Sequence, residues 1–326
     1  MSQPKKKRFQ LFNLAKDGKG VKKNERITNF NLGNFFVLFV RRFGTIVSVN
    51  LVYVFGNFPI LFALLGLSGQ RWHQEANVLY PALRAITAGG YTPVTAALSG
   101  VIGERSLFEI SASPVYTVLF WLTLLLLLTF GPVNTGCAYI LRNCVKGDPI
   151  FFFQDFFYAI KKNWKQAFLF GAIDLILLAL LGYDVVFFYY NSVDFVRSAM
   201  FFIALFIAII YFVMRFYIYT MMVTFDLSIW KLIKNAFIFS TVGFKRNFLA
   251  CVGMLLVAAL TIALILVYLP LGAVLPLVIV FGTCAFMATY AAYPKIKQIM
   301  IDPYYRDHPE EAAEEPDVEP VFHDRG

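Results

Sequence analysis

Charged residues are scarce in this sequence: they make up 15% of the chain, whereas hydrophobic residues make up 59%. A soluble domain usually carries about 25% charged residues, so this composition argues against a globular protein surrounded by water. Uncharged apolar stretches of roughly 20 residues are long enough to cross about 30 Å of hydrocarbon as helices. The sequence therefore predicts an all-α membrane protein.

Residues that usually hold metals or carry out catalysis are also few. The chain has four cysteines and three histidines, with no C-x-x-C pair and no spacing typical of metal ligands. It lacks the phosphate-binding G-x-x-x-x-G-K motif, the metalloprotease H-E-x-x-H motif and the hydrolase G-x-S-x-G motif. We therefore expect no metal, no cofactor, no catalytic residues and no enzymatic activity.

Basic residues are nearly missing from alternate segments of the chain. Of the 29 Lys and Arg, 25 fall in the segments 1–42, 142–165, 215–246 and 295–326. The other four are Arg71, Arg84, Arg105 and Arg197. Because Lys and Arg accumulate in cytoplasmic loops, this alternation predicts six spans with both termini in the cytoplasm. The net charge of +9 then indicates contact with the anionic headgroups of the lipid bilayer, and no nucleic-acid partner is expected.

The apolar stretches predict spans at about 43–67, 115–137, 167–189, 198–222, 248–269 and 273–293. Residues 247–294 carry no charge, and we expect residues 269–272 (LPLG) to form an outer turn within this stretch. The six-helix domain is predicted to cover 31–300, including an outer segment at 68–114. A basic, flexible arm over 1–30 precedes it, and an acidic tail over 301–326, predicted to be disordered, follows it.

An internal threefold repeat of helical hairpins is suggested by the ends of the inward-returning spans. Tyr139, Tyr217 and Tyr293 each stand nine residues before an aspartate: Asp148, Asp226 and Asp302. Duplication and convergent membrane-boundary chemistry both explain this pattern. Between the hairpins, residues 151–165 and 227–235 combine aromatic residues and lysines at helical spacing. They are predicted to be amphipathic helices in the cytoplasmic interface, with a docking surface for a partner as the alternative.

One region resembles a known family. The motifs GPVNTG (131–136), YILRN (139–143), QDF (154–156) and KNWKQA (162–167) follow one another here. In this order they are similar to the YesL-like family of uncharacterised bacterial integral membrane proteins, which are often encoded beside genes for carbohydrate uptake. The resemblance implies a location in the bacterial plasma membrane and a helper role in carbohydrate uptake, and it supplies no catalytic residues. The outer segment 68–114 is longer than the family pattern.

A candidate intramembrane polar site consists of Asp174, Asn50 and Asn134. Asp174 lies nine residues after Lys165, which places it roughly 13 Å along the third span. The repeat places Asn50 at a similar depth, where the two side chains could face each other. Asn134 follows Gly131-Pro132, which could bend a helix and frame a cavity. An intramembrane carboxylate suggests a proton relay or a solute site, and a structural hydrogen bond between helices is the alternative.

If Asp174 only joins helices, Asp174→Asn should be nearly neutral and Asp174→Leu should cost about 1 kcal/mol. Two functions follow from these readings. The favoured one is a non-enzymatic accessory or interaction protein of the membrane, with a transport system as its partner. The alternative is a small-solute transporter or permease that uses the intramembrane carboxylate.

Overall fold

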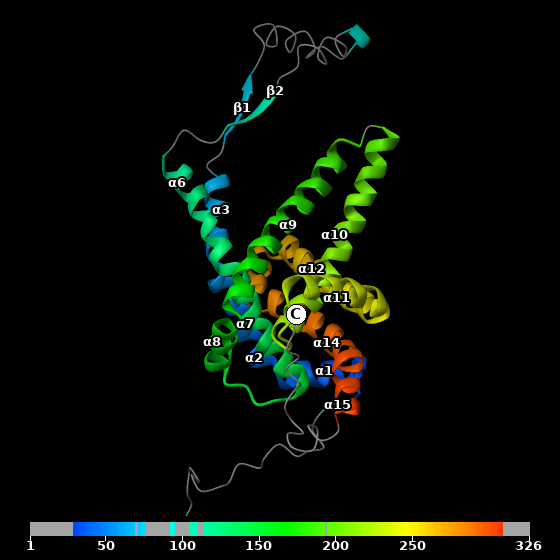
Figure 1. Cartoon of the computed structure of the whole chain (residues 1–326). Coiled ribbons are helices and arrows are strands. Elements are labelled where there is room, and N and C mark those ends of the chain that lie inside the picture. The colour runs from blue at the N-terminus through cyan, green and yellow to red at the C-terminus, as the bar shows by residue number, and fades with distance from the viewer. Residues whose placement is uncertain are drawn as a thin grey trace, which may run out of the picture.

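The computed structural model describes residues 29–68, 71–75, 92–94, 105–109, 114–192 and 194–308. Apart from two short strands, the elements within these ranges are helices, which confirms the predicted all-α membrane bundle (Figure 1). Nearly all of the basic arm 1–30, most of the outer segment 68–114 and the tail after 308 lie outside the described residues.

Several helices are long and apolar enough to cross a membrane. The described residues contain five such runs: Pro114–Lys146, Trp164–Tyr190 (α9), Phe195–Met222 (α10), Phe244–Val267 (α12) and Leu269–Asp307. A sixth would be added by α1 (Leu32–Arg41) and α2 (Phe43–Gly56), which meet at 76°, if the pair is counted as one span. The protein is therefore a multi-pass membrane protein by the length and composition of its helices.

Two of these runs are made of several helical pieces. The first consists of α6 (Pro114–Leu122), the 3-10 turn η2 (Thr123–Leu125) and α7 (Leu126–Lys146). The last consists of α13 (Leu269–Leu275), η3 (Pro276–Val280), α14 (Phe281–Ile296), η4 (Lys297–Ile301) and α15 (Asp302–Asp307). Both η3 and η4 are π-helical turns.

The predicted span 43–67 is divided in the structure. It consists of α2 and α3 (Pro59–Ser68), with a break at Asn57 and Phe58. Pro59 explains the break, because proline lacks an N–H group and disfavours helical backbone at the residue before it. The side-chain amide of Asn57 donates to the carbonyl of Tyr53 at 3.1 Å and so stabilises the end of α2.

The predicted outer turn at 269–272 is wrong in position. The chain turns at Tyr268, between α12 and α13, and Leu269 already begins α13. Pro270 lies in the first turn of this helix, where its missing N–H group leaves no intrahelical bond unmade. Leu269 and Pro270 thus start a helix that packs against α12.

Three helices each end one residue before a longer one. They are α1, α8 (Phe152–Lys162) and α11 (Ile229–Val242), and the single residues that separate them from α2, α9 and α12 are Arg42, Asn163 and Gly243. Helices were predicted within 151–165 and 227–235, and α8 and α11 form there. The sequence analysis did not identify α1.

The two strands occupy both ends of the outer segment. β1 (Arg71–Glu75) pairs antiparallel with β2 (Arg105–Glu109), with Arg71 opposite Glu109. Because α3 and α6 pack side by side, the chain leaves and re-enters the bundle at neighbouring points, and these two pieces can pair. The strands lie at one end of the molecule, while α1, α8 and α15 lie toward the other (Figure 1).

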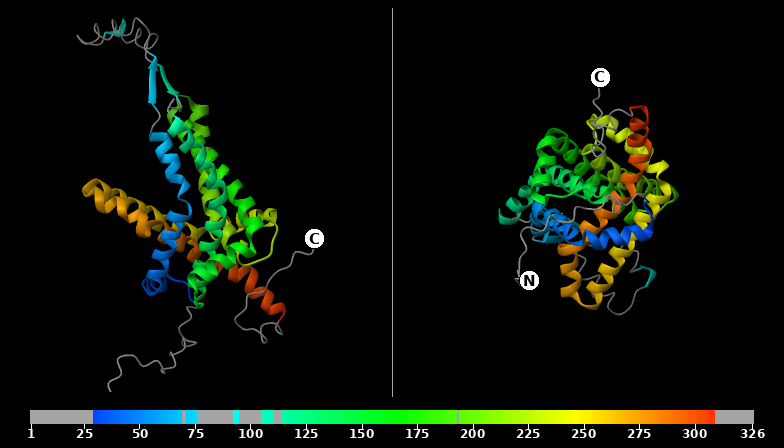
Figure 2. Two further views of the ribbon diagram at one scale, coloured as in Figure 1. Left: turned by 90° about the vertical axis from the view of Figure 1, so that its left-hand side faces the viewer. Right: turned by 90° about the horizontal axis from the view of Figure 1, so that it is seen from below.

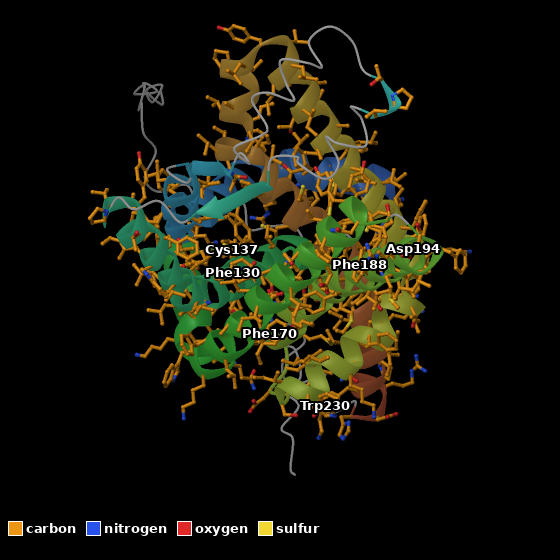
Figure 3. The ribbon with its side chains drawn as sticks, turned by 90° about the horizontal axis from the view of Figure 1, so that it is seen from above. Phe130, Cys137, Phe170, Phe188, Asp194 and Trp230 are labelled. Carbon is orange, nitrogen blue, oxygen red and sulfur yellow. The ribbon has the colours of Figure 1, made fainter. Side chains whose placement is uncertain are left out.

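The core is centred on α7, which packs against α2, α8, α9, α10 and α14. Ile140 and Cys137 of α7 are completely buried. Apolar side chains also project around the outside of the bundle, with Trp230 at the periphery and Phe170 near the centre (Figure 3). Helices α12 and α13 extend away from α7, α9 and α10 (Figure 2). Their exposed apolar surface is the kind that lipid covers in a membrane protein.

Candidate functional site

Asp174 is completely buried, and both of its carboxylate oxygens are occupied by side chains of α10. The hydroxyl of Tyr211 donates to Oδ1 at 2.8 Å, and the hydroxyl of Tyr219 donates to Oδ2 at 2.6 Å. The guanidinium of Arg215 reaches both oxygens, with Nε 2.8 Å from Oδ1 and 3.1 Å from Oδ2. The site is therefore a buried ion pair with two additional hydrogen bonds.

The spacing of residues on α10 explains how one helix supplies all three partners. Tyr211, Arg215 and Tyr219 are four residues apart, so they lie along one face of the helix. That face packs against α9, which carries Asp174. The pairing of one carboxylate with one guanidinium leaves no net charge between the two helices.

Aromatic rings surround the ion pair. The guanidinium carbon of Arg215 lies 5.7 Å from the ring centroid of Phe130 and 6.0 Å from that of Tyr219. Phe170, one turn before Asp174 on α9, meets the ring of Tyr219 edge-on at 5.4 Å. The rings favour the cation through their π faces, while the side chain of Arg215 is 19% exposed.

This arrangement restricts the chemistry open to Asp174. A solute hydroxyl or a cation would have to displace Tyr211, Arg215 or Tyr219 before it could bind the carboxylate. A saturated, buried ion pair joins helices well, whereas a relay group needs a path for its proton. The geometry therefore favours the structural reading of Asp174.

Asn50 forms hydrogen bonds with backbone groups at an irregular part of the last helical run. Its side-chain amide donates to the carbonyls of Pro276 at 3.0 Å and Leu277 at 2.8 Å, and its Oδ1 accepts from the N–H of Gly282 at 2.8 Å. Pro276 and Leu277 are the first residues of the π-helical turn η3, and Gly282 follows it in α14, so Asn50 bonds to backbone groups where the regular pattern of intrahelical bonds is interrupted. Gly282 lets α2 approach, because a Cβ there would lie 2.5 Å from the carbonyl oxygen of Ile46.

Asn134 makes a local contact within α7. Its side-chain amide donates to the carbonyl of Phe130, four residues earlier, at 2.7 Å. The neighbouring Gly131 is a packing residue, because a Cβ there would overlap the carbonyl oxygen of Ala167 on α9. Gly171 of α9 faces it, and a Cβ at Gly171 would overlap the backbone of Gly131. The Gly131-Pro132 motif thus brings α7 and α9 into close contact.

The three residues predicted to form one polar site have different partners. Asp174 bonds to α10, Asn50 bonds to η3 and α14, and Asn134 bonds within α7. Asp174 connects α9 to α10, whereas Asn50 connects α2 to η3 and α14. The two side chains therefore join different pairs of helices. Each of the three side chains therefore stabilises a different part of the structure.

Residues 115–185 match the model of the family "Protein of unknown function, DUF624". A search of curated proteins found no match, and neither did a search of solved structures. The DUF624 match runs from α6 into α9, so it contains Asp174 and both glycines of the α7–α9 contact, whereas Arg215 lies beyond it. It identifies a family of uncharacterised bacterial proteins, and the resemblance to the YesL-like family stays a prediction.

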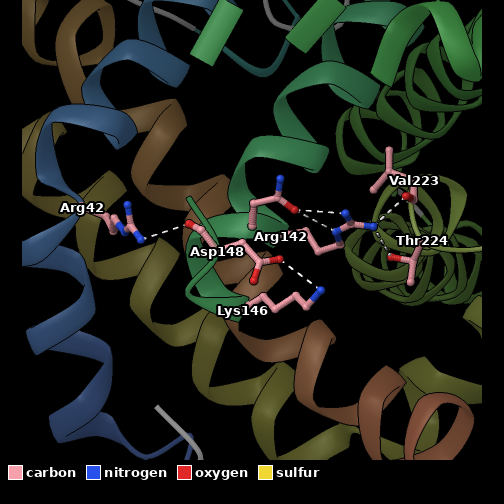
Figure 4. A network of polar contacts seen from close by, with 7 residues as sticks. Arg42, Arg142, Lys146, Asp148, Val223 and Thr224 are labelled. Carbon is pink, nitrogen blue, oxygen red and sulfur yellow. Dashed lines mark hydrogen bonds and ion pairs between the residues drawn. The ribbon is translucent and has the colours of Figure 1, made fainter. Parts of the chain in front are cut away.

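A second polar cluster lies at the end of α7 (Figure 4), and its residues on α7 fall inside the DUF624 match. Arg142 is buried, and its Nη1 donates to the carbonyl of Val223 at 2.7 Å and to Oγ1 of Thr224 at 3.4 Å. Its Nη2 donates to Oδ1 of Asn143 at 3.0 Å. Val223 is the C-cap of α10, so the guanidinium binds the negative end of that helix.

The same cluster attaches α2 to the end of α7 (Figure 4). Gly147 ends α7 with a left-handed φ of 87°, a conformation that glycine adopts without strain. The next residue, Asp148, accepts from Nη2 of Arg42 through its carbonyl at 3.2 Å and forms an ion pair with Lys146 at 3.1 Å. Arg142 therefore connects α7 to α10, and Arg42 connects the start of α2 to the segment that follows α7.

The sequence analysis missed Arg215 as the partner of Asp174. It counted Arg215 among the basic residues of the cytoplasmic segment 215–246, although the residue lies within the predicted span 198–222. Two signals were present: an arginine well inside an apolar span, and tyrosines four residues before and after it. An intramembrane carboxylate almost always has a charged or polar partner, so these signals together identify Arg215.

Proposed function

We propose that this protein is a non-enzymatic accessory protein of the bacterial plasma membrane that assists carbohydrate uptake through a transport-system partner. The observation that carries the proposal is the state of Asp174, the intramembrane carboxylate. It is completely buried, and its two oxygens are held by Tyr211, Arg215 and Tyr219. A protein that moves a solute or a proton through such a group needs access to it. The carbohydrate part of the proposal comes from the resemblance to the YesL-like family.

The proposed orientation has both termini and the short helices in the cytoplasm. The distribution of Lys and Arg supports it, and so does the placement of α1, α8 and α15 away from the strands (Figure 1). In α8, Phe153 and Phe157 are exposed beside Lys161 and Lys162. Rings in the acyl region and lysines at the headgroups would hold such a helix in the interface.

The threefold repeat is part of the same proposal. Its support is the recurrence of a helix, one separating residue and a longer helix at Arg42, Asn163 and Gly243. Each unit would place a short interfacial helix before a hairpin of spans. Tandem hairpins of this kind are common in membrane proteins built from repeats.

Cysteine labelling tests the orientation. The four native cysteines are first replaced by alanine, and single cysteines are introduced at Glu75 and Lys161. A membrane-impermeant maleimide applied to intact cells should label position 75, and it should label position 161 only after permeabilisation. The reverse pattern, with position 161 accessible and position 75 protected, would invert the proposed topology.

A variant that lacks both charges of the ion pair distinguishes the accessory role from the transporter alternative. The variant Asp174→Asn/Arg215→Gln removes both charges together and keeps hydrogen-bonding groups on both helices. It is expressed in a strain that lacks the gene, and growth is compared on a panel of carbohydrates as sole carbon sources. The accessory role predicts wild-type growth wherever the folded yield is normal.

The transporter alternative predicts the opposite result in the same strain. Normal folded yield with lost growth would make the carboxylate functional, because asparagine and glutamine cannot titrate or carry charge. Wild-type protein reconstituted in liposomes provides a second readout: the accessory role predicts carbohydrate flux no higher than in empty liposomes. If the wild-type protein carries carbohydrate flux and the double variant does not, the protein is a transporter and the accessory proposal is wrong.

A further inference from the structure

A basic cleft lies where the junction of α11 and α12 meets the end of α14. Its volume is about 490 Å³, within the range of small-molecule sites. It is lined by Val242, Gly243, Phe244, Lys245, Arg246, Pro294, Lys295 and Gln298. Three of these residues are cationic and none is acidic, so the cleft attracts an anion.

Two cations of the cleft, Arg246 and Lys295, have uncharged partners. Nη2 of Arg246 donates to the carbonyl of Tyr290 at 3.4 Å, and its guanidinium carbon lies 5.9 Å from the ring centroid of Phe30. Nζ of Lys295 donates to Oε1 of Gln298 at 3.0 Å. In the part of the chain that the structure describes, the ion pairs involve other residues. The positive charge of the cleft is therefore not neutralised there.

The cleft lies at the boundary between the charged and uncharged parts of the last hairpin. Lys245 and Arg246 immediately precede the uncharged run 247–294, and Lys295 immediately follows it. Charged residues flanking an apolar hairpin stand at the level of the lipid headgroups.

Apolar side chains continue from the cleft along α12. Phe244 is 65% exposed and Phe248 is 60% exposed, and their rings stack with centroids 6.0 Å apart. Val242 is also exposed beside them. A free phosphate ion makes no use of such a surface, whereas the acyl chain of a phospholipid would cover it.

We propose that this cleft binds the phosphate group of an anionic phospholipid, with an acyl chain along Phe244 and Phe248. Basic pockets between spans on the cytoplasmic side are typical sites for anionic headgroups. Arg246 and Lys295 contact the phosphate from opposite sides of the cleft, and Lys245 contributes charge at its rim. The site goes beyond the proposed function, because lipid binding requires neither a carbohydrate nor a protein partner.

The test uses the full chain purified in a mild non-ionic detergent. Native mass spectrometry measures the bound fraction during titration with phosphatidylglycerol or with phosphatidylcholine of the same acyl chains. The cleft variant is Lys245→Gln/Lys295→Gln, which leaves the packed Arg246 unchanged. The matched control is Lys161→Gln/Lys162→Gln, which removes the same charge from two exposed positions of α8.

Wild-type protein should bind phosphatidylglycerol about ten-fold more tightly than phosphatidylcholine, and the cleft variant should lose most of that preference. The control variant should keep it. Equal binding of both lipids would show that the cations of the cleft do not select an anionic headgroup, and it would overturn the site. An equal loss of preference in the control would show diffuse attraction to the basic surface, and it would overturn the site as well. If inorganic phosphate displaces bound phosphatidylglycerol as effectively as added phosphatidylglycerol does, the acyl chain contributes nothing to binding. The ligand would then be a free phosphate ion, and the proposal that it is a phospholipid would be wrong.

Discussion

Asp174→Asn should destabilise the protein by about 3–5 kcal/mol, the usual cost of removing one partner of a buried ion pair. The substitution keeps the size and an acceptor oxygen, but it leaves the guanidinium of Arg215 without a counter-charge in an apolar setting. Arg215→Gln should cost less, since the remaining carboxylate of Asp174 can take up a proton, whereas a guanidinium stays charged. Unfolding in mixed micelles, with folded yield as a second measure, tests this order.

The double variant Asp174→Asn/Arg215→Gln serves as the control for this prediction. Because it leaves no unpaired charge, it should recover most of the stability lost in Asp174→Asn. The four proteins form a double-mutant cycle that isolates the interaction between the two residues. A single Asp174→Asn variant as stable as the wild type would contradict the buried ion pair. From the sequence alone, Asp174→Asn was expected to be nearly neutral if Asp174 only joins helices. That expectation treated Asp174 as a hydrogen-bonding group without a charged partner.

Gly171→Ala should destabilise the contact between α7 and α9 by at least the 1–3 kcal/mol typical of overpacking. A Cβ at position 171 would overlap the backbone of Gly131. Relief requires the two helices to move apart, because backbone atoms cannot rotate away as a side chain can. The melting temperature in detergent should fall, and Gly131→Ala should act in the same direction.

Gly182→Ala is the matched control, since it makes the same change on the same helix. No atom lies within 4 Å of a Cβ at position 182, and the residue is exposed. Its melting temperature should stay at the wild-type value or rise slightly, because alanine favours a helix more than glycine does. Equal losses from Gly171→Ala and Gly182→Ala would mean that glycine flexibility in α9, rather than the close contact with α7, sets the stability.

Much of the fold followed from local patterns. Spans were predicted from apolar length, and all five runs now described begin within four residues of a predicted start. The predicted starts are 115, 167, 198, 248 and 273, and the observed ones are Pro114, Trp164, Phe195, Phe244 and Leu269. The helices α8 and α11 followed from aromatic residues and lysines at helical spacing. The break at Pro59 and the start of α13 at Leu269 were not predicted, because proline can either end a helix or occupy its first turn.

The candidate site was predicted less well. Asp174 was identified correctly as an unusual buried group, but its pairing with Arg215 was not. Asn50 and Asp174 were grouped by equal depth along their helices, and depth says nothing about which side of a helix a residue occupies. The bonds of Asn50 to Pro276 and Gly282 also join residues more than two hundred positions apart, so no local pattern relates them.

Hydropathy and charge are properties of each segment, and through them the sequence established a helical membrane protein, the approximate spans and Asp174 as an intramembrane carboxylate. Which side chains contact one another depends on how each helix is rotated about its axis and on which neighbouring helix it packs against. The pairing of Asp174 with Arg215, the contact of Gly131 with Gly171 and the cleft between Arg246 and Lys295 became visible only when the helices were packed together. The physical reason is that each of these arrangements depends on the relative positions of two or more helices, which no single segment encodes.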